Sequence, residues 1–300
     1  SPTPVPQADD VALGAYIPGA PSDPTKIDAY AALTGRMPAV VMWYQSWSGP
    51  WNAFYARGAD AIHARGSMPM ISWEPWAGLK DDPQWSLASI NAGNHDAYIR
   101  TWARDVAAWG KPIYVRPMYE MNGTWTSWSP GVNGNTAAQF RQAWRHIVGL
   151  VRAQGASNIS WVWAPNVDDG NPRFTPYADV YPGDAYVDWA GLDGYNWGTS
   201  ESWSSWQGLR SVFGSSIGQI SGVTNKPLMI AEIGSTELGG DKAAWITDGY
   251  ARLRTDFPQV RTVIWFHANK ETDWRVDSSV ASRDAYRTVV AQDGFSGTLP

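Results

Sequence analysis

Two short apolar segments of this chain each end on a glutamate. One runs from Ile113 to Glu120 and the other from Pro227 to Glu232. Apolar segments of this length between turn residues are typical of buried strands in a parallel sheet. A carboxylate at the carboxyl end of such a strand lies at the mouth of an α/β fold, where active sites are built. The two glutamates are therefore the first candidates for chemistry.

Strand-like segments recur along the whole chain, with helical patterns between most of them. The eight predicted strands are residues 13–17, 39–43, 68–73, 113–117, 159–164, 187–192, 228–231 and 262–266. Eight strands that alternate with helices predict an α/β protein with a single (β/α)8 TIM barrel. We expect this catalytic domain at residues 11–300. The proline-rich residues 1–10 are typical of a linker remnant of a modular secreted chain, or of a cloning boundary.

Three of the predicted helices have recognisable ends. Their predicted N-caps are Asn94, Asn135 and Asp241, and the helices are expected to run to Gly110, Gly155 and Leu253. Asparagine and aspartate favour the first position because their side chains accept from free backbone N–H groups. Glycine favours the end because it adopts the left-handed conformation there.

A pair of carboxylates at the mouth of a barrel suggests the two acidic groups that break a glycosidic bond. On opposite strands, Glu120 and Glu232 could approach to the distance used by retaining enzymes, about 5–5.5 Å. Glu74 and Asp193 compete for these roles, because each also follows a predicted strand. Either could contact a ligand, orient a neighbour or cap a helix, so that position alone favours Glu120 and Glu232.

Tryptophan is unusually abundant, with 20 residues among 300. Indole faces stack on the apolar faces of sugar rings. Tryptophans close to predicted strand ends are Trp43, Trp47, Trp51, Trp73, Trp76, Trp125, Trp128, Trp197, Trp203, Trp265 and Trp274. Any one of them could equally be a core residue, as we expect for Trp102, Trp109, Trp144 and Trp245. Their repeated placement after strands favours a carbohydrate ligand.

The composition argues against several other classes of protein. The net charge is −5 and no basic patch is visible, which argues against nucleic-acid binding. No apolar stretch is long enough to span a membrane, and the absence of cysteine excludes disulfides and thiolate metal sites. The four histidines have no metal-ligand spacing. The acidic run from Asp168 to Asn171 lacks the rest of a calcium loop, so we predict a polar turn and neither metal nor cofactor.

Five segments carry a resemblance to a known family. Residues 116–128 (RPMYEMNGTWTSW) resemble the acid/base signature of glycoside hydrolase family 26, a clan A barrel family, and residues 226–235 (KPLMIAEIGS) resemble its nucleophile signature. Residues 181–189, 192–199 and 263–275 are similar to the branch that includes mixed-linkage β-glucanases (lichenases), more than to typical β-mannanases. The resemblance covers residues 10 to 292.

The resemblance implies a role for several residues. Glu120 would be the general acid and base, and Glu232 the nucleophile. Arg116 would keep Glu232 ionised, Tyr195 would fix its rotamer, and Trp265 would form the floor under the sugar at the cleavage point. Each of these three residues could instead have a structural role. Arg116 could pair with any buried charge, Tyr195 could cap a turn, and Trp265 could pack in the barrel. The other predicted substrate contacts are Tyr119, Trp125, Trp128, Glu74, Trp76, Asn196, Trp197 and His267; for His267, loop support is an equal alternative.

One position departs from the family pattern. Family members commonly carry a histidine just before the acid/base residue, and this chain has Tyr119 there. That neighbour reaches the sugar hydroxyl next to the anomeric carbon, which is axial in mannose and equatorial in glucose. The departure therefore bears on the choice of substrate and leaves the catalytic pair unchanged.

Together these features predict a secreted, endo-acting retaining β-glycanase that hydrolyses mixed-linkage β-1,3-1,4-glucan of plant or lichen cell walls. The alternatives are an endo-β-1,4-mannanase acting on β-mannan, or a β-xylanase, on the same scaffold. A non-catalytic polysaccharide-binding protein is a third alternative. We expect a monomer or one module of a larger chain.

Overall fold

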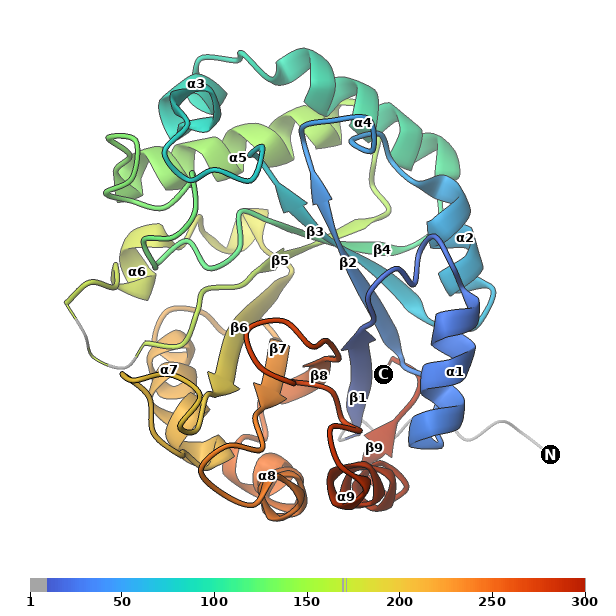
Figure 1. Cartoon of the computed structure of the whole chain (residues 1–300). Helices are drawn as coiled ribbons and strands as arrows, with labels where there is room; N and C mark the ends of the chain where they lie inside the picture. The colour runs from blue at the N-terminus through green and yellow to red at the C-terminus, as the bar shows by residue number, and fades with distance from the viewer. Residues whose placement is uncertain (1–9, 169, 171, 300) are drawn as a thin grey trace.

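The strands of the chain close into a parallel barrel with helices around it (Figure 1). The computed structural model describes residues 10–168, 170 and 172–299. Strands β1 to β8 follow one another in chain order, and β1 pairs with both β8 and β2, which closes the ring. The predicted (β/α)8 barrel is confirmed.

The strands overlap the predicted segments, but several are longer. They are β1 (Val11–Tyr16), β2 (Val40–Ser46), β3 (Met68–Glu74), β4 (Ile113–Pro117), β5 (Ile159–Trp163), β6 (Trp189–Asn196), β7 (Leu228–Ser235) and β8 (Val260–Phe266). Strands β2, β6 and β7 extend beyond their predicted carboxyl ends. The additional residues include polar ones, which therefore lie at the mouth of the barrel. A short β9 (Phe295–Ser296) pairs with the start of β1.

The helices lie outside the strands. They are α1 (Thr25–Thr34), α2 (Ala56–His63), α3 (Leu87–Asn91), α4 (Asp96–Trp109), α5 (Ala137–Ala153), α6 (Tyr177–Val180), α7 (Leu209–Ser221), α8 (Lys242–Asp256) and α9 (Val280–Val290), with short 3-10 turns η1 (Pro83–Trp85) and η2 (Asp184–Tyr186). Among the described residues, no helix combines the length and apolar character of a membrane span.

Two of the three predicted N-caps are displaced by one residue. His95 precedes α4, whereas Asn94 donates to the Ser89 hydroxyl. Thr136 caps α5 in a reciprocal capping box with Gln139, because that pair satisfies two free N–H groups together. The predicted cap Asp241 is confirmed, since it accepts from the Ala244 N–H at the start of α8 (2.9 Å).

Asn135 and two of the three predicted helix ends also have clear positions; the third helix, α8, continues past its predicted end at Leu253 to Asp256. The side chain of Asn135 accepts from the Leu87 N–H (2.9 Å) and donates to loop carbonyls, so it joins two loops instead of capping a helix. Gly110 ends α4 in the left-handed conformation, with φ of 70°. Gly155 lies just after α5 with φ of 84°.

Two predicted segments fall on residues that are not described. The proline-rich linker lies outside the described residues except for Asp10. The acidic run is described only at Asp168 and Gly170, where the Asp168 carboxylate accepts from the Gly170 N–H (2.7 Å).

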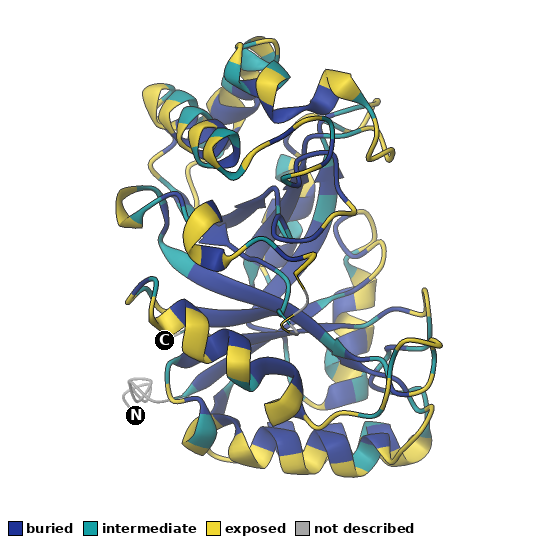
Figure 2. Ribbon diagram, turned by 90° about the vertical axis from the view of Figure 1, so that its left-hand side faces the viewer, coloured by how far each residue is buried: buried dark blue, intermediate teal, exposed yellow. Residues whose placement is uncertain are grey.

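The strands separate two apolar cores. Inside the barrel pack Val40, Met42, Met70, Tyr114, Val162, Ala164, Met229, Ala231 and Ile264. A larger core lies between the strands and the helices, and Figure 2 shows the buried strands within helices whose outer faces are exposed. Because successive strand residues point to opposite sides, the parity of a residue in its strand decides whether it faces the barrel or the helices.

Candidate active site

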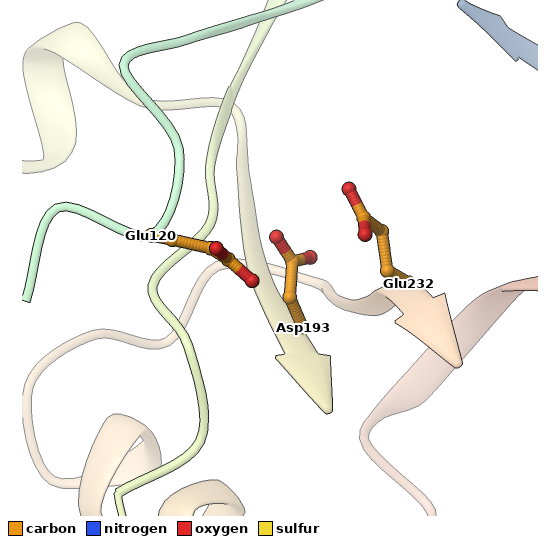
Figure 3. A group of neighbouring side chains, drawn as sticks. All are labelled: Glu120, Asp193 and Glu232. Carbon is orange, nitrogen blue, oxygen red and sulfur yellow. The ribbon is translucent and has the colours of Figure 1, made fainter. Parts of the chain in front are cut away.

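Three carboxylates meet at the mouth of the barrel (Figure 3). Glu120, Asp193 and Glu232 each place a carboxylate oxygen within 4.8 Å of the others. Glu120 comes from the loop after β4, Asp193 from β6 and Glu232 from β7. The structure therefore brings together the two glutamates that the sequence singled out, and adds the aspartate between them.

The sequence suggested that Glu120 lies at the end of its strand. In the structure β4 ends at Pro117, and Glu120 lies in the loop that follows. Met118 and Glu120 both have left-handed backbones, with φ of 48° and 52°. For a residue other than glycine this conformation costs on the order of 1–3 kcal/mol. The Glu120 N–H donates to the carbonyl of Ala164, just beyond β5 (2.8 Å), and this bond holds the turn in place. The strained turn sets the position of the Glu120 carboxyl group.

An extra residue in β7 determines the direction of Glu232. Leu192 of β6 pairs with Ile230, but the next residue, Asp193, pairs with Glu232. A second irregularity lies on the β8 side. Ala231 packs inside the barrel, so strict alternation would turn the following residue toward the helices. The bulge brings Glu232 to the inner side as well.

Three donors surround the carboxylate of Glu232. Arg116 Nη2 and the Tyr44 hydroxyl donate to Oε1, and the Tyr195 hydroxyl donates to Oε2. Hydrogen bonds donated to a carboxylate favour its charged form. Only 5% of the side chain is exposed. The three donors therefore hold the Glu232 carboxylate in one orientation.

Arg116 is fully buried and connects two of the carboxylates. Besides Glu232, it binds both oxygens of Asp193 through Nη1 (2.7 and 2.6 Å). Its Nε and Nη2 donate to the Ser72 hydroxyl (3.1 and 2.8 Å), and its Cζ lies 4.4 Å from the centre of the Tyr119 ring. The predicted contact of Arg116 with Glu232 is confirmed. Since no part of the Arg116 side chain is exposed, it has no surface for the direct substrate contact that was also predicted.

Glu120 has a different environment. Its Oε2 accepts one hydrogen bond, from the Trp125 indole (2.6 Å). Burial of the carboxyl group and the nearby charge of Glu232 raise the pKa of Glu120 to about 7, although the Trp125 hydrogen bond acts in the opposite direction. A carboxyl group with this pKa is largely protonated in mildly acidic solution and can donate a proton.

The three carboxylates also have a spacing that could hold a metal ion, judged among the described residues. Arg116 already places its positive charge against Asp193 and Glu232. A bound cation would have to compete with this guanidinium at close range.

Tyr119 and Glu74 form a pair beside Glu120 and Glu232. The Tyr119 hydroxyl donates to Glu74 Oε1 (2.6 Å), and Glu74 is the last residue of β3. Burial raises the pKa of Glu74, while the hydrogen bond from Tyr119 lowers it. The Tyr119 ring also lies 5.6 Å from that of Tyr44. The residue that replaces the family's histidine is thus fixed by a carboxylate on the neighbouring strand.

The predicted sugar floor at Trp265 is wrong. Ile264 and Phe266 pack on the barrel side, so Trp265 points outward between them. Its ring is fully buried and lies 5.4 Å from Tyr286 of α9. Trp265 is a core residue, as its structural explanation allowed, and Phe266 takes the inward position.

The other predicted tryptophans divide into buried and open groups. Trp128 is fully buried, donates to the Tyr119 carbonyl (2.8 Å) and supports that residue from behind, so its predicted sugar contact is also wrong. Trp43, Trp47, Trp73 and Trp274 are buried as well. Trp76 and Trp197 are half-buried, and Trp125 is 36% exposed. These three remain predicted sugar contacts, and Trp51 and Trp203 are more exposed still.

Asn196 and His267 were also predicted to contact a sugar, and both support the protein backbone in the structure. Asn196 is fully buried and accepts from the N–H groups of Gly198 (3.2 Å) and Gln207 (2.9 Å), so the prediction of a sugar contact is wrong. His267 Nδ1 accepts from the Val276 N–H (3.2 Å), and burial lowers its pKa to about 4. The structure thus shows the loop-supporting role of His267.

Tyr44 and Phe266 were not identified from the sequence, although they lie at the site. Tyr44 binds Glu232, and its ring centre lies 6.4 Å from that of Phe266. Tyr16 stacks on Phe266 at 4.7 Å. The signal that could have found them is parity, because Tyr44 follows Val40 and Met42 at intervals of two residues on the inward face of β2.

Other proteins are similar to this chain in sequence. It is 42% identical to Endoglucanase H of Acetivibrio thermocellus over 290 residues, which is 95% of this chain and 31% of that protein. It is 31% identical to a β-1,3-xylanase of a Vibrio species over 127 residues, or 40% of this chain and 26% of that protein. The chain thus spans less than a third of the length of these relatives.

Solved structures share the fold. A family 26 β-mannanase from Bacteroides ovatus superimposes with a TM-score of 0.72 at 17% identity, over 96% of this chain and 90% of that one. A family model described as glycosyl hydrolase family 26 matches residues 90–247, which include all three central carboxylates. This match confirms the predicted resemblance: the chain belongs to glycosyl hydrolase family 26.

Proposed function

We propose that the chain is a retaining endo-β-glycanase that hydrolyses mixed-linkage β-1,3-1,4-glucan, with Glu232 as nucleophile and Glu120 as acid and base. The observation that carries this proposal is the distance between the two carboxylates. Their oxygens approach within 4.8 Å, whereas an inverting pair needs about 6.5–9.5 Å to admit a water molecule. The short separation favours direct attack by one carboxylate.

In the first step Glu232 attacks the anomeric carbon. Its Oε2 accepts one hydrogen bond, from Tyr195, and keeps a lone pair for the new bond. As the glycosidic bond breaks, the leaving oxygen takes the proton of Glu120. The products of this step are a glycosyl ester on Glu232 and a shortened sugar chain with a free hydroxyl group.

In the second step Glu120 acts as a base. The charge of Glu232 is one of the causes that raise the pKa of Glu120, and this charge disappears when the ester forms. The pKa of Glu120 therefore falls, and the carboxylate can take a proton from water as the water attacks the anomeric carbon. Hydrolysis restores the charge on Glu232 and the proton on Glu120.

The choice of glucan is supported by the 42% identity to Endoglucanase H over nearly the whole chain. The mannanase structures share the fold at 17% identity, which carries no information on substrate. Tyr119, in place of the family's histidine, is bound to Glu74. This fixed hydroxyl lies where specificity for the sugar beside the cleaved bond is expected.

A reducing-sugar assay on barley β-glucan, lichenan, galactomannan and xylan tests the substrate. We expect release from the two mixed-linkage glucans. Release from galactomannan or xylan alone would overturn the choice of glucan and leave the catalytic pair in place. No hydrolysis of any of the four, together with binding to one of them, would favour a polysaccharide-binding protein.

The site of action follows from the size of the substrate. A cell-wall polymer cannot cross a membrane, so we place the enzyme outside the cell, as a monomeric catalytic unit that can be part of a larger chain. The distribution of products tests endo action: early products of mixed length support it, and a single short sugar from the first minutes contradicts it.

A further inference from the structure

A buried lysine binds the loop after β8. Lys242 is the first residue of α8 and has no exposed surface. Its Nζ donates to the carbonyl groups of Asp273 (3.3 Å) and Arg275 (2.7 Å) and to the hydroxyl of Ser278 (2.8 Å). An ammonium group has three donors. All of them are used on residues 267–279, the loop that joins β8 to α9.

This is an unfavourable place for a lysine. The amino end of a helix carries partial positive charge, which disfavours a cation. Burial opposes the charge as well and lowers the pKa of Lys242 to about 8, although Glu237 nearby acts in the opposite direction. Glu237 itself accepts from the hydroxyls of Ser278 and Ser282 (2.7 Å each). The contacts of Lys242 with the loop must offset these costs.

The loop supports a residue of the active site. Trp274 lies between the two residues whose carbonyls Lys242 binds, and its ring packs on Tyr195 with centres 4.8 Å apart. Gly234 of β7 permits this close packing, because a Cβ there would lie 3.1 Å from Tyr195 and 3.2 Å from Trp274. Tyr195 in turn donates its hydroxyl to Glu232. The chain of contacts leads from Lys242 to the nucleophile.

We propose that Lys242 is a positioning residue for the nucleophile. It fixes the backbone on both sides of Trp274, the Trp274 ring fixes Tyr195, and the Tyr195 hydroxyl orients Oε2 of Glu232 for attack. This inference rests on the proposed function, because it assigns attack to Glu232. It extends that function to a residue with no contact to the catalytic carboxylates.

The loop has other anchors that keep it folded without Lys242. Trp265 Nε1 donates to the Trp274 carbonyl (2.8 Å), and His267 accepts from the Val276 N–H (3.2 Å). We therefore expect Lys242→Met to fold and to leave the loop in place with a looser Trp274. A misplaced catalytic group can cost about 10²-fold in rate without loss of substrate binding.

A double-mutant cycle tests the inference. Lys242→Met and Tyr195→Phe are each expected to lower kcat by ~10–100-fold on the polysaccharide that the wild type hydrolyses, with KM changed by about twofold or less. If Lys242 acts through Tyr195, the kcat of the double variant should lie within about threefold of the kcat of the slower single variant. Losses that multiply would overturn the positioning role, since a purely structural lysine would lower kcat equally in both backgrounds.

Two further variants complete the experiment. Lys111→Met removes an exposed lysine that binds Asp60 at the opposite end of the barrel, and its kcat should equal that of the wild type. If Lys242→Met fails to fold, Ser278→Ala replaces it in the cycle with Tyr195→Phe and is judged by the same rule. A wild type that hydrolyses none of the polysaccharides overturns the proposed function itself, whereas multiplying losses in an active enzyme overturn only the role of Lys242.

Discussion

Glu120 and Glu232 have identical side chains and lie close together at the mouth of the barrel, but their surroundings differ. Glu232 lies on a strand and accepts hydrogen bonds from a buried arginine and two tyrosines. Glu120 lies in a left-handed turn and accepts one, from an indole. The first environment fixes the orientation of the Glu232 carboxylate, whereas burial and the nearby charge of Glu232 raise the pKa of Glu120 to about 7. On the proposed function, the different surroundings of the two glutamates suit them to different roles.

The largest effect is expected from Glu232→Ala. The nearest other carboxylate, Asp193, is fully buried with both oxygens bound by Arg116 and is not free to replace the nucleophile, so kcat should fall by roughly 10⁴-fold or more. Binding to the insoluble polysaccharide should persist, which a pull-down assay measures. Activity within about 100-fold of the wild type would show that Glu232 is not the nucleophile and would remove the difference between the two glutamates.

Glu120→Ala sharpens the comparison through the leaving group. On the polysaccharide we expect a loss of ~10²–10⁴-fold, because the departing oxygen needs a proton. On an aryl glycoside with an acidic phenol as leaving group, bond cleavage should be affected much less. Steady-state and burst kinetics on both substrates measure this difference; equal losses would argue that Glu120 has no role in proton donation.

Arg116→Met tests the ionic environment of Glu232 through stability. The substitution leaves Asp193 and Glu232 buried without their partner, which costs on the order of 3–5 kcal/mol of unfolding free energy. Urea unfolding at neutral pH measures the loss. The matched control is Arg65→Met, which removes a surface pair with Asp28 and should have little effect. Equal stability of the two variants would contradict a buried ionic centre.

The smallest effect is expected from Trp125→Phe, and it should appear as a change in the pH dependence of kcat/KM. The acid form of Glu120 is required for the first step, so kcat/KM of the wild type should fall as the pH rises through about 7. The Trp125 hydrogen bond lowers the pKa of Glu120, so its removal raises that pKa. The alkaline limb should therefore move modestly to higher pH. A shift to lower pH would mean that the indole stabilises the protonated form.

The barrel could be predicted from the sequence because each strand is a short apolar segment between turn residues, as at 113–117 and 228–231. The meeting of Glu120 and Glu232 at the mouth of the barrel could be predicted because both glutamates follow such segments. Trp265 shows the limit of this reasoning, since proximity to a strand end does not tell which side a residue faces. Counting parity from Ile264 and Phe266 would have turned it outward.

Other features of the site have no simple sequence signal. The bulge that turns Glu232 inward depends on how β7 pairs with both neighbouring strands. The left-handed turn at Met118 and Glu120 is held by the distant Ala164 carbonyl. The contact of Tyr44 with Glu232 joins residues 188 positions apart. All three features depend on contacts that form only when the barrel closes. A local sequence pattern therefore does not predict them.

The anomeric form of the first product tests the central claim most directly. The two glutamates are expected to act in succession on the same carbon, so a mixed-linkage β-glucan should release sugars whose new reducing end is initially β. Proton NMR during the first minutes of hydrolysis, before mutarotation, measures the ratio of the two anomers. An initial excess of the β-anomer is the predicted result. An initial excess of the α-anomer would show a single displacement by water and contradict a covalent role for Glu232.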